Sequence, residues 1–358
     1  TIACAFALAP LMQALGQPPI FAVAVGALIG GVGQVALQWP SLRREGFRYQ
    51  PAFDPRDPGL RQVLLLMGPG AIGLAATQVN IFVNTLLATS QGTGAVSWLT
   101  YAFRLMYLPI GLFGVSIATA VLPVVSRHAA LDDVAGIRST VSRGLAMMLM
   151  LSIPATFGLI ALSTPIVQLL FERGRFLPSD TAATAGALRF YAVGLVGYSA
   201  ARIASPVFYA LRQSRVPVVV SVATIVANVW LSVTLVRVMG FRGLALGTSL
   251  AALANGAMLI VLLRRRLGGI EARRLWVALA KVTAAASLMV LAALGMGHVM
   301  AHVASGQHFA TQLLRVGVSI GAALAVLTAA AKVLRIQEFD ETMTVIRSRI
   351  HSRPPAPL

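Results

Sequence analysis

The chain has few charged residues and very few acidic ones. Charged residues make up 11% of its 358 positions, with 11 Asp and Glu against 29 Lys and Arg. Together with 57% hydrophobic residues and a mean hydropathy of +0.80, this excludes an ordinary soluble domain and is typical of a polytopic membrane protein. A nucleic-acid-binding domain would gather its basic residues on one solvated face. Here they stand between apolar runs, so we expect no nucleic-acid partner.

Residues that carry catalysis or bind metals are also scarce. Cys4 is the only cysteine, so no intrachain disulfide can form. All 11 acidic residues lie in loops, near the ends of apolar runs or in the C-terminal tail, and no cluster of His, Cys, Asp or Glu has catalytic spacing at a membrane surface. We therefore expect no enzyme activity, no cofactor and no metal ion.

Ten apolar runs predict an all-α membrane protein with about ten transmembrane helices. They are residues 2–16, 20–39, 62–88, 98–125, 144–171, 182–210, 216–238, 243–263, 275–300 and 311–334. The first run begins at the start of the sequence, without an initiator Met or the basic region of a signal peptide. We expect further helices upstream of it.

Basic residues alternate between the loops in a way that orients the chain. Loops 40–61, 126–143, 211–215 and 264–281, together with the tail, carry 21 Lys and Arg, whereas the intervening loops carry four. Because cytoplasmic loops are enriched in Lys and Arg, this pattern places the first set of loops and the C-terminus in the cytoplasm.

One arginine lies well inside an apolar run. Residues 98–125 read WLTYAFRLMYLPIGLFGVSIATAVLPVV, and Arg104 lies two turns into this run, where it costs roughly 2.5 to 3.5 kcal/mol. Since no carboxylate lies in the runs to pair with it, a cavity-facing Arg104 would require an external anion, and its planar fork of donors suits phosphate. The alternative is that Arg104 extends to the outer interface.

Other polar positions accompany this arginine. The sequence Gly68-Pro69-Gly70 predicts a broken helix, as found at transporter binding sites. Thr77, Asn80 and Asn84 share one helix face, where they line the same cavity as Arg104 or, alternatively, bond to neighbouring helices. Arg202, about two turns inside its helix, contacts either substrate or lipid phosphate.

Three segments resemble the MurJ (MviN) family of lipid II flippases, which belongs to the MOP exporter superfamily with the multidrug and toxin extruders. They are GAVSWLTYAFRLMYLPIGLFGVSIATAVLPVVSRHAA, LLFERGRFLPSDTAATAGALRFYAVGL and FYALRQSRVPVVV. The resemblance implies a MATE-like fold of fourteen helices, of which ten are present here. It implies the last two helices of the first lobe at 1–39, a cytoplasmic interfacial linker at 40–57, a six-helix lobe at 58–266, two helices forming a lipid-tail groove at 270–334 and a cytoplasmic tail at 335–358.

The resemblance also implies a function. It places Arg104 on the cavity arginine of the family's eighth helix, which engages the lipid-linked diphosphate, with Arg202, Thr77, Asn80 and Asn84 as further candidate contacts. Many members have an acidic residue directly before this arginine, where this chain has Phe103. Some members bind sodium in the second lobe, and Asn228 and Thr248 would be remnants of such a site, but no carboxylate accompanies them.

We therefore expect a flippase of the bacterial cytoplasmic (inner) membrane. Its expected partners are lipid II, membrane phospholipids and, on the cytoplasmic side, cell-wall synthesis proteins. Two alternatives remain open at this point. One is a flippase or exporter of another lipid-linked glycan or a drug, and the other is a non-transporting scaffold for cell-wall assembly.

Overall fold

The structure is a computed structural model that describes residues 2–18, 20–46, 75, 77–303, 308–336 and 339. The all-α prediction is confirmed, because these residues form helices and their connecting turns and contain no strand. Seven helical segments among them are long and apolar enough to cross a membrane. The predicted linker falls largely on residues 47–57 and the predicted helix break on residues 68–70, and both lie outside the described residues.

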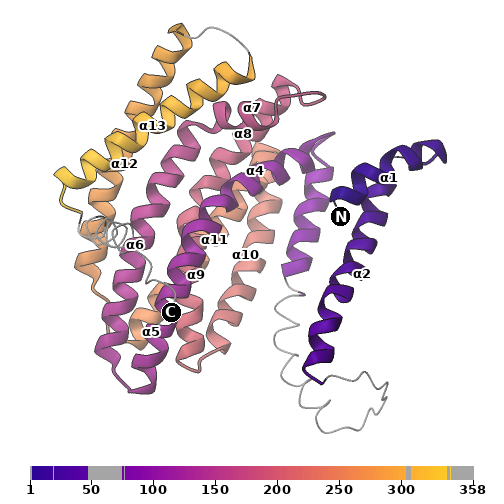
Figure 1. Cartoon of the computed structure of the whole chain (residues 1–358). Coiled ribbons are helices and arrows are strands. Elements are labelled where there is room, and N and C mark those ends of the chain that lie inside the picture. Colours follow the sequence, from indigo (N-terminus) through magenta and orange to yellow (C-terminus); the bar gives the residue numbers. More distant parts are fainter. Residues whose placement is uncertain are drawn as a thin grey trace, which may run out of the picture. The chain divides into compact units, whose positions relative to one another are not determined.

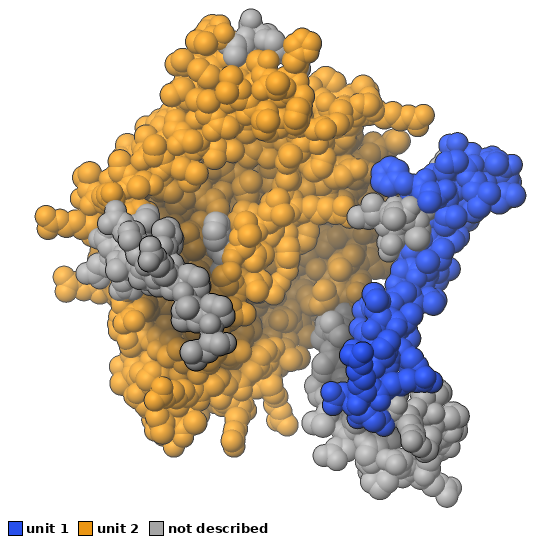
Figure 2. All heavy atoms as spheres, viewed as in Figure 1, with its two compact units in different colours: residues 1–67 blue, residues 68–358 orange. Residues whose placement is uncertain are grey.

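The chain divides into two units, residues 1–67 and residues 68–358, drawn blue and orange in Figure 2. In the first unit, α1 (Ile2–Ala14) packs against α2 (Ile20–Arg44). Gly16 adopts a φ of 69° in the turn that joins them, a conformation that glycine enters without steric cost. The lobe and groove boundaries implied by the family resemblance stay predictions.

The second unit is a bundle of apolar helices (Figure 1). It consists of a helical segment at 77–89, α4 (Ala95–Pro109), the π-helical η1 (Ile110–Gly114), α5 (Val115–Ala130), α6 (Val134–Ala161), α7 (Ser163–Phe171), α8 (Pro178–Val193), α9 (Leu195–Ala210), α10 (Arg215–Met239), α11 (Phe241–Arg266), α12 (Ala272–Val303) and α13 (Phe309–Val333).

Two predicted single runs are each divided in the structure. Residues 144–171 cross from α6 into α7, where the Ser163 hydroxyl donates to the Ile160 carbonyl and competes with the backbone for it. Residues 182–210 are divided at Gly194 into α8 and α9. A Cβ on Gly194 would lie 2.7 Å from the Ser249 Cα, so α11 approaches this junction at backbone distance.

The approach of α11 continues along α9. A Cβ on Gly256 of α11 would lie 2.6 Å from the Gly197 carbonyl oxygen of α9, and one on Gly197 would overlap the Ala252 backbone. Small residues allow this kind of contact between membrane helices, where dispersion and not the hydrophobic effect holds helices together. The crossing fixes α9, which carries Arg202, against the bundle.

Hydrogen bonds gather the arginine-rich loops at one end of the second unit. Arg138 Nη2 donates to the Leu267 carbonyl at 2.6 Å, and the Ser142 hydroxyl accepts from the Glu271 amide at 3.1 Å. At the other end, Trp98 Nε1 donates to Asp180 Oδ1 at 2.8 Å. The bonds thus join the basic stretches 126–143 and 264–281 to each other, while the alternation of the remaining loops and the side of the membrane on which each end lies stay predictions.

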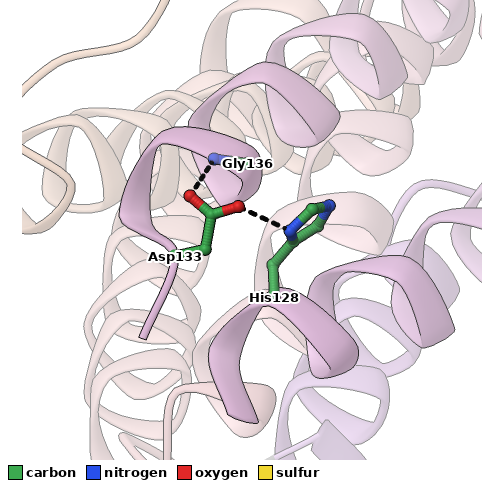
Figure 3. Close-up of polar contacts among 3 residues, drawn as sticks. All are labelled: His128, Asp133 and Gly136. Carbon is green, nitrogen blue, oxygen red and sulfur yellow. Dashed lines mark hydrogen bonds and ion pairs between the residues drawn. The ribbon is translucent and has the colours of Figure 1, made fainter. Parts of the chain in front are cut away.

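The turn between α5 and α6 is closed by one carboxylate (Figure 3). Asp133 caps α6: its Oδ1 accepts from the Gly136 amide at 2.9 Å, and its Oδ2 lies 2.9 Å from His128 Nδ1 on α5. The Gly136 amide, and then the His128 ring, hold the pKa of Asp133 below its ordinary value. A Cβ on Gly136 would overlap both side chains, so a larger residue there would displace them.

This cap predicts a pH-dependent stability. A carboxylate whose pKa is lowered by folding stabilises the folded state above its unfolded pKa of about 4, and the stabilisation is lost as pH falls through the folded pKa. Asp133→Ala should therefore lower the thermal unfolding midpoint of the detergent-solubilised protein at neutral pH, by an amount that shrinks below about pH 4. Asp133→Asn, which can still cap the helix, is the control and should lose less. A deficit that is equal at all pH values would contradict this account.

Candidate functional arginine site

Arg104 lies deep within a continuous helical segment. The segment runs from Ala95 to Ala130 through α4, η1 and α5, and Arg104 is nine residues beyond its start. At 1.5 Å per residue, that is about 14 Å along the helix axis from Ala95. The helix begins three residues earlier than the predicted apolar run.

The Arg104 side chain is exposed on the described surface. Together with Phe103, Tyr107, Leu108, Gly111 and Leu112 it lines an open hollow of about 590 Å³. Within the described part of the chain, its guanidinium makes no hydrogen bond or ion pair. An arginine placed in this way has all five N–H donors available to a ligand or to water.

Tyr107 connects this surface to a second arginine. It lies one helical turn after Arg104, on the same side of α4. Arg202 Nη2, from α9, donates to the Tyr107 hydroxyl, and the Arg202 guanidinium lies 5.8 Å from the centre of the Tyr107 ring. The structure thus places Arg202, like Arg104, beside Tyr107.

The backbone of η1 lies next to Arg202. A Cβ on Gly114 would contact the Arg202 stem at 3.9 Å. The π-helical turn directly follows Pro109, whose ring removes one backbone donor from the helix. Such turns are common at functional sites, and this one brings an apolar, glycine-containing surface against the second arginine.

Phe103 anchors the same face in an aromatic cluster. Its ring lies 5.9 Å from that of Tyr107, 5.5 Å from Tyr191 of α8 and 6.3 Å from Tyr198 of α9. Offset and edge-on contacts of this kind each contribute about 0.5–1.5 kcal/mol beyond burial. The residue directly before Arg104 is thus a packing residue that contacts Tyr107.

The predicted polar strip at 77–89 bonds to α10. Asn228 Nδ2 donates to Asn80 Oδ1 at 2.8 Å, and the Ser232 hydroxyl donates to Asn84 Oδ1 at 2.9 Å. The interhelical alternative for Asn80 and Asn84 is thus what the structure contains, and such bonds contribute about 0.6 kcal/mol each. Thr77 is exposed on the same segment. Substrate contact by these three residues stays a prediction.

Two further polar side chains have structural roles. Arg189 Nε donates to the Ser163 hydroxyl at 2.8 Å and its Nη2 to the Thr164 hydroxyl at 3.1 Å, which ties α8 to the start of α7. Thr248 donates to the Leu244 carbonyl at 2.8 Å within its own helix. No group of three or more His, Cys, Asp or Glu residues among the described positions has a geometry suited to a metal ion.

Comparison with known families bears on this arrangement. A family model described as "Lipid II flippase MurJ" matches residues 2–314. The chain belongs to the lipid II flippase MurJ family. It is thus placed among transporters and not in an enzyme family, and its membership makes it a membrane protein.

Curated MurJ proteins resemble the chain over about half of their own length. The probable lipid II flippase MurJ of Vibrio cholerae is 34% identical over 258 residues, which cover 72% of this chain and 48% of that protein. The lipid II flippase MurJ of Burkholderia cenocepacia is 31% identical over 269 residues, covering 74% of this chain and 51% of that protein.

Solved structures confirm the fold. A lipid II flippase MurJ in an inward closed conformation matches with a TM-score of 0.71 at 23% identity, over 91% of this chain and 65% of that one. An outward-facing MATE transporter of the MOP superfamily matches with a TM-score of 0.51 at 15% identity, over 76% of this chain and 65% of that one. The predicted MATE-like MOP fold is thus correct.

Tyr107 is the residue that the sequence analysis missed. In an apolar run, a tyrosine reads as a core or interface side chain, and its partner Arg202 is 95 positions away in the sequence. The signal that could have identified it is its spacing from Arg104, because a hydroxyl three residues from a membrane arginine shares its helix face.

The two arginines should differ in chemical reactivity. Phenylglyoxal modifies free guanidinium groups, so Arg104, which is exposed and without a partner in the described chain, should react faster than Arg202, which is held by Tyr107. Tyr107→Phe should raise the reactivity of Arg202 and leave that of Arg189, held by two hydroxyls, unchanged. Peptide mass spectrometry after a timed reaction measures all three. Protection of Arg104 against the reagent would show that it faces lipid and not a water-filled cavity.

Proposed function

We propose that this chain is part of a lipid II flippase, which moves undecaprenyl-diphosphate-linked peptidoglycan precursor from the inner to the outer leaflet of the bacterial cytoplasmic membrane. The observation that supports this most directly is Arg104, an exposed arginine within an apolar helix, without a partner among the described residues. The family's curated members carry the same activity in their names.

The chemistry of the substrate matches that of the site. A diphosphate offers several anionic oxygens, and a guanidinium binds two of them at once through parallel N–H donors. In a site of low dielectric, this pairing is stronger than it would be in water. It also offsets the cost of holding Arg104 inside the membrane.

Arg202 would supply a second contact. It is exposed, and its partner is a neutral phenol, which is a weaker acceptor than a phosphate oxygen. A diphosphate that enters beside Arg104 can therefore take the Arg202 donor from Tyr107. Thr77, Asn80 and Asn84 on the 77–89 segment are further candidate contacts, and Asn80 and Asn84 would first have to give up their bonds to α10.

Transport requires that this site open alternately to the two sides. Repeat-based transporters achieve this by rocking one lobe against another around a binding site near the bilayer midplane. In this proposal residues 58–266 form one such lobe and the lipid tail stays in the bilayer beside residues 270–334. The C-terminus and the basic loops lie in the cytoplasm, where cell-wall synthesis proteins would contact them.

Substitution of Arg104 tests the proposal. In a form of the protein that carries both lobes, Arg104→Ala should abolish flipping without preventing membrane insertion, since an arginine at this depth costs stability and does not supply it. Arg104→Lys keeps the charge without the planar fork and should be partly active at best. The measurement is growth of cells depleted of their own flippase, with expression of each variant checked by immunoblot.

Two controls sharpen this experiment. Arg189→Ala removes an arginine of the same helix bundle that bonds to hydroxyls, so its effect should appear as lower protein stability and not as a loss specific to transport. Accumulation of precursor in the inner leaflet identifies the blocked step. Full growth with Arg104→Ala would overturn the assignment of Arg104 as the substrate-binding residue.

The orientation is tested separately. With Cys4 replaced by Ser, a single cysteine is placed at one of two exposed positions, 173 or 214, and treated with an impermeant maleimide. Intact cells expose the outer side of the membrane to this reagent, and inverted vesicles expose the cytoplasmic side. The cysteine at position 173 should react in intact cells. The cysteine at position 214 should react in inverted vesicles, because position 214 lies in an arginine-rich loop, which is expected in the cytoplasm. Labelling of both from the same side would contradict the topology.

A further inference from the structure

A basic hollow lies where the beginning of α12 meets the end of α13. Its volume is about 680 Å³, and it is distant in sequence from the Arg104 site. Among the residues that the structure describes, four basic residues and one acidic residue, Glu271, line it. The basic residues are Arg273, Arg274, Lys281 and Arg335.

The positions of these charges are fixed by the fold. Lys281 Nζ donates to the Arg335 carbonyl at 3.2 Å, which joins the two helices. Arg335 has a φ of 49° in the turn that ends α13, and the following residue, Ile336, is buried with its amide bonded to the Ala331 carbonyl. The Arg335 backbone is therefore held against α12, and its exposed side chain starts from the rim of the hollow.

The described residues that line the hollow carry an excess of positive charge. The Glu271 carboxylate lies 3.8 Å from Arg274 Nη1 and offsets that residue. Arg273, Lys281 and Arg335 remain as three cations around one concave surface. Cations gathered in this way repel one another, and an anion bound among them relieves that repulsion.

The surroundings indicate what kind of anion fits. Part of the lining is apolar, from Val277, Ala278 and Ile336. Trp276 in the same turn of α12 is 69% exposed, and exposed tryptophans at the ends of membrane helices lie at the level of the lipid headgroups. At the level of the headgroups, the hollow thus presents basic side chains beside apolar ones. A soluble phosphate would need only the basic side chains, whereas a phospholipid also offers apolar groups to the others.

We infer that this hollow binds the headgroup phosphate of an anionic phospholipid from the surrounding bilayer. Arg273, Lys281 and Arg335 contact the phosphate, and Val277 and Ile336 contact the glycerol and the upper part of the acyl chains. The site does not depend on transport or on Arg104. The bound lipid would hold the start of α12 and the end of α13 together.

Native mass spectrometry of the purified, detergent-solubilised protein tests this inference. Phosphatidylglycerol and zwitterionic phosphatidylcholine are titrated against the unchanged protein, against Arg273→Gln/Lys281→Gln, and against Arg264→Gln/Lys332→Gln. The last variant loses the same charge at nearby exposed positions that do not line the hollow. A direct hydrogen bond to a charged phosphate contributes about tenfold or more to affinity, so we expect the first variant to bind phosphatidylglycerol at least about tenfold more weakly.

Three further readings decide the outcome. The control variant should bind phosphatidylglycerol as the unchanged protein does, and phosphatidylcholine should bind all three proteins equally weakly. Arg273→Lys/Lys281→Arg, which keeps both charges, should retain binding. Equal loss in both glutamine variants would mean that the basic surface attracts lipid without a site and would overturn the inference. Displacement of phosphatidylglycerol by an equal concentration of inorganic phosphate or glycerol phosphate would assign the hollow to a soluble anion and overturn it as well.

Discussion

The cost of placing arginine inside a membrane is the constraint on which the second unit depends. The sequence contains no acidic residue within its apolar runs, so neutral oxygens must accept the arginine donors. Ser163 and Thr164 do so for Arg189, and Tyr107 does so for Arg202. Arg104 has no such acceptor among the described residues. The fold thus satisfies two arginines of this bundle internally and leaves a third available to an anion from outside.

Close helix packing makes this arrangement possible. Gly197 and Gly256 bring the backbones of α9 and α11 into contact, and this fixes the register of α9, on which Tyr198 and Arg202 lie. Tyr198 in turn packs against Phe103, one residue before Arg104. The small residues where α9 crosses α11 therefore help to determine where Arg104 lies on α4. Since packing and not the hydrophobic effect holds membrane helices together, such crossings are where position is decided.

The sequence alone predicted the features that depend on local composition. The length of the apolar runs predicted the helices, and the distribution of Lys and Arg among the loops predicted their alternation. A charged residue inside an apolar run identified Arg104 as a candidate. It did not predict the break at Gly194, because that break reflects contact with Ser249 of another helix. Nor did it predict the Tyr107 and Arg202 pair, whose members are brought together only by the tertiary fold. For Asn80 and Asn84 the sequence allowed two interpretations, and only the position of α10 showed that both side chains bond to it.

Release of a bound diphosphate is as necessary for transport as its capture, and Tyr107 bears on both. A guanidinium stripped of all partners inside a membrane would hold a phosphate too strongly to let it go. When Arg202 binds phosphate, it exchanges a neutral acceptor, the Tyr107 hydroxyl, for an anionic one. The gain in binding free energy is therefore the difference between these two hydrogen bonds, and not the full free energy of the bond to phosphate. When the phosphate leaves, the donor returns to the phenol. Within the proposed mechanism, Arg104 thus supplies the attraction, while Tyr107 keeps the contribution of Arg202 small enough to be reversed.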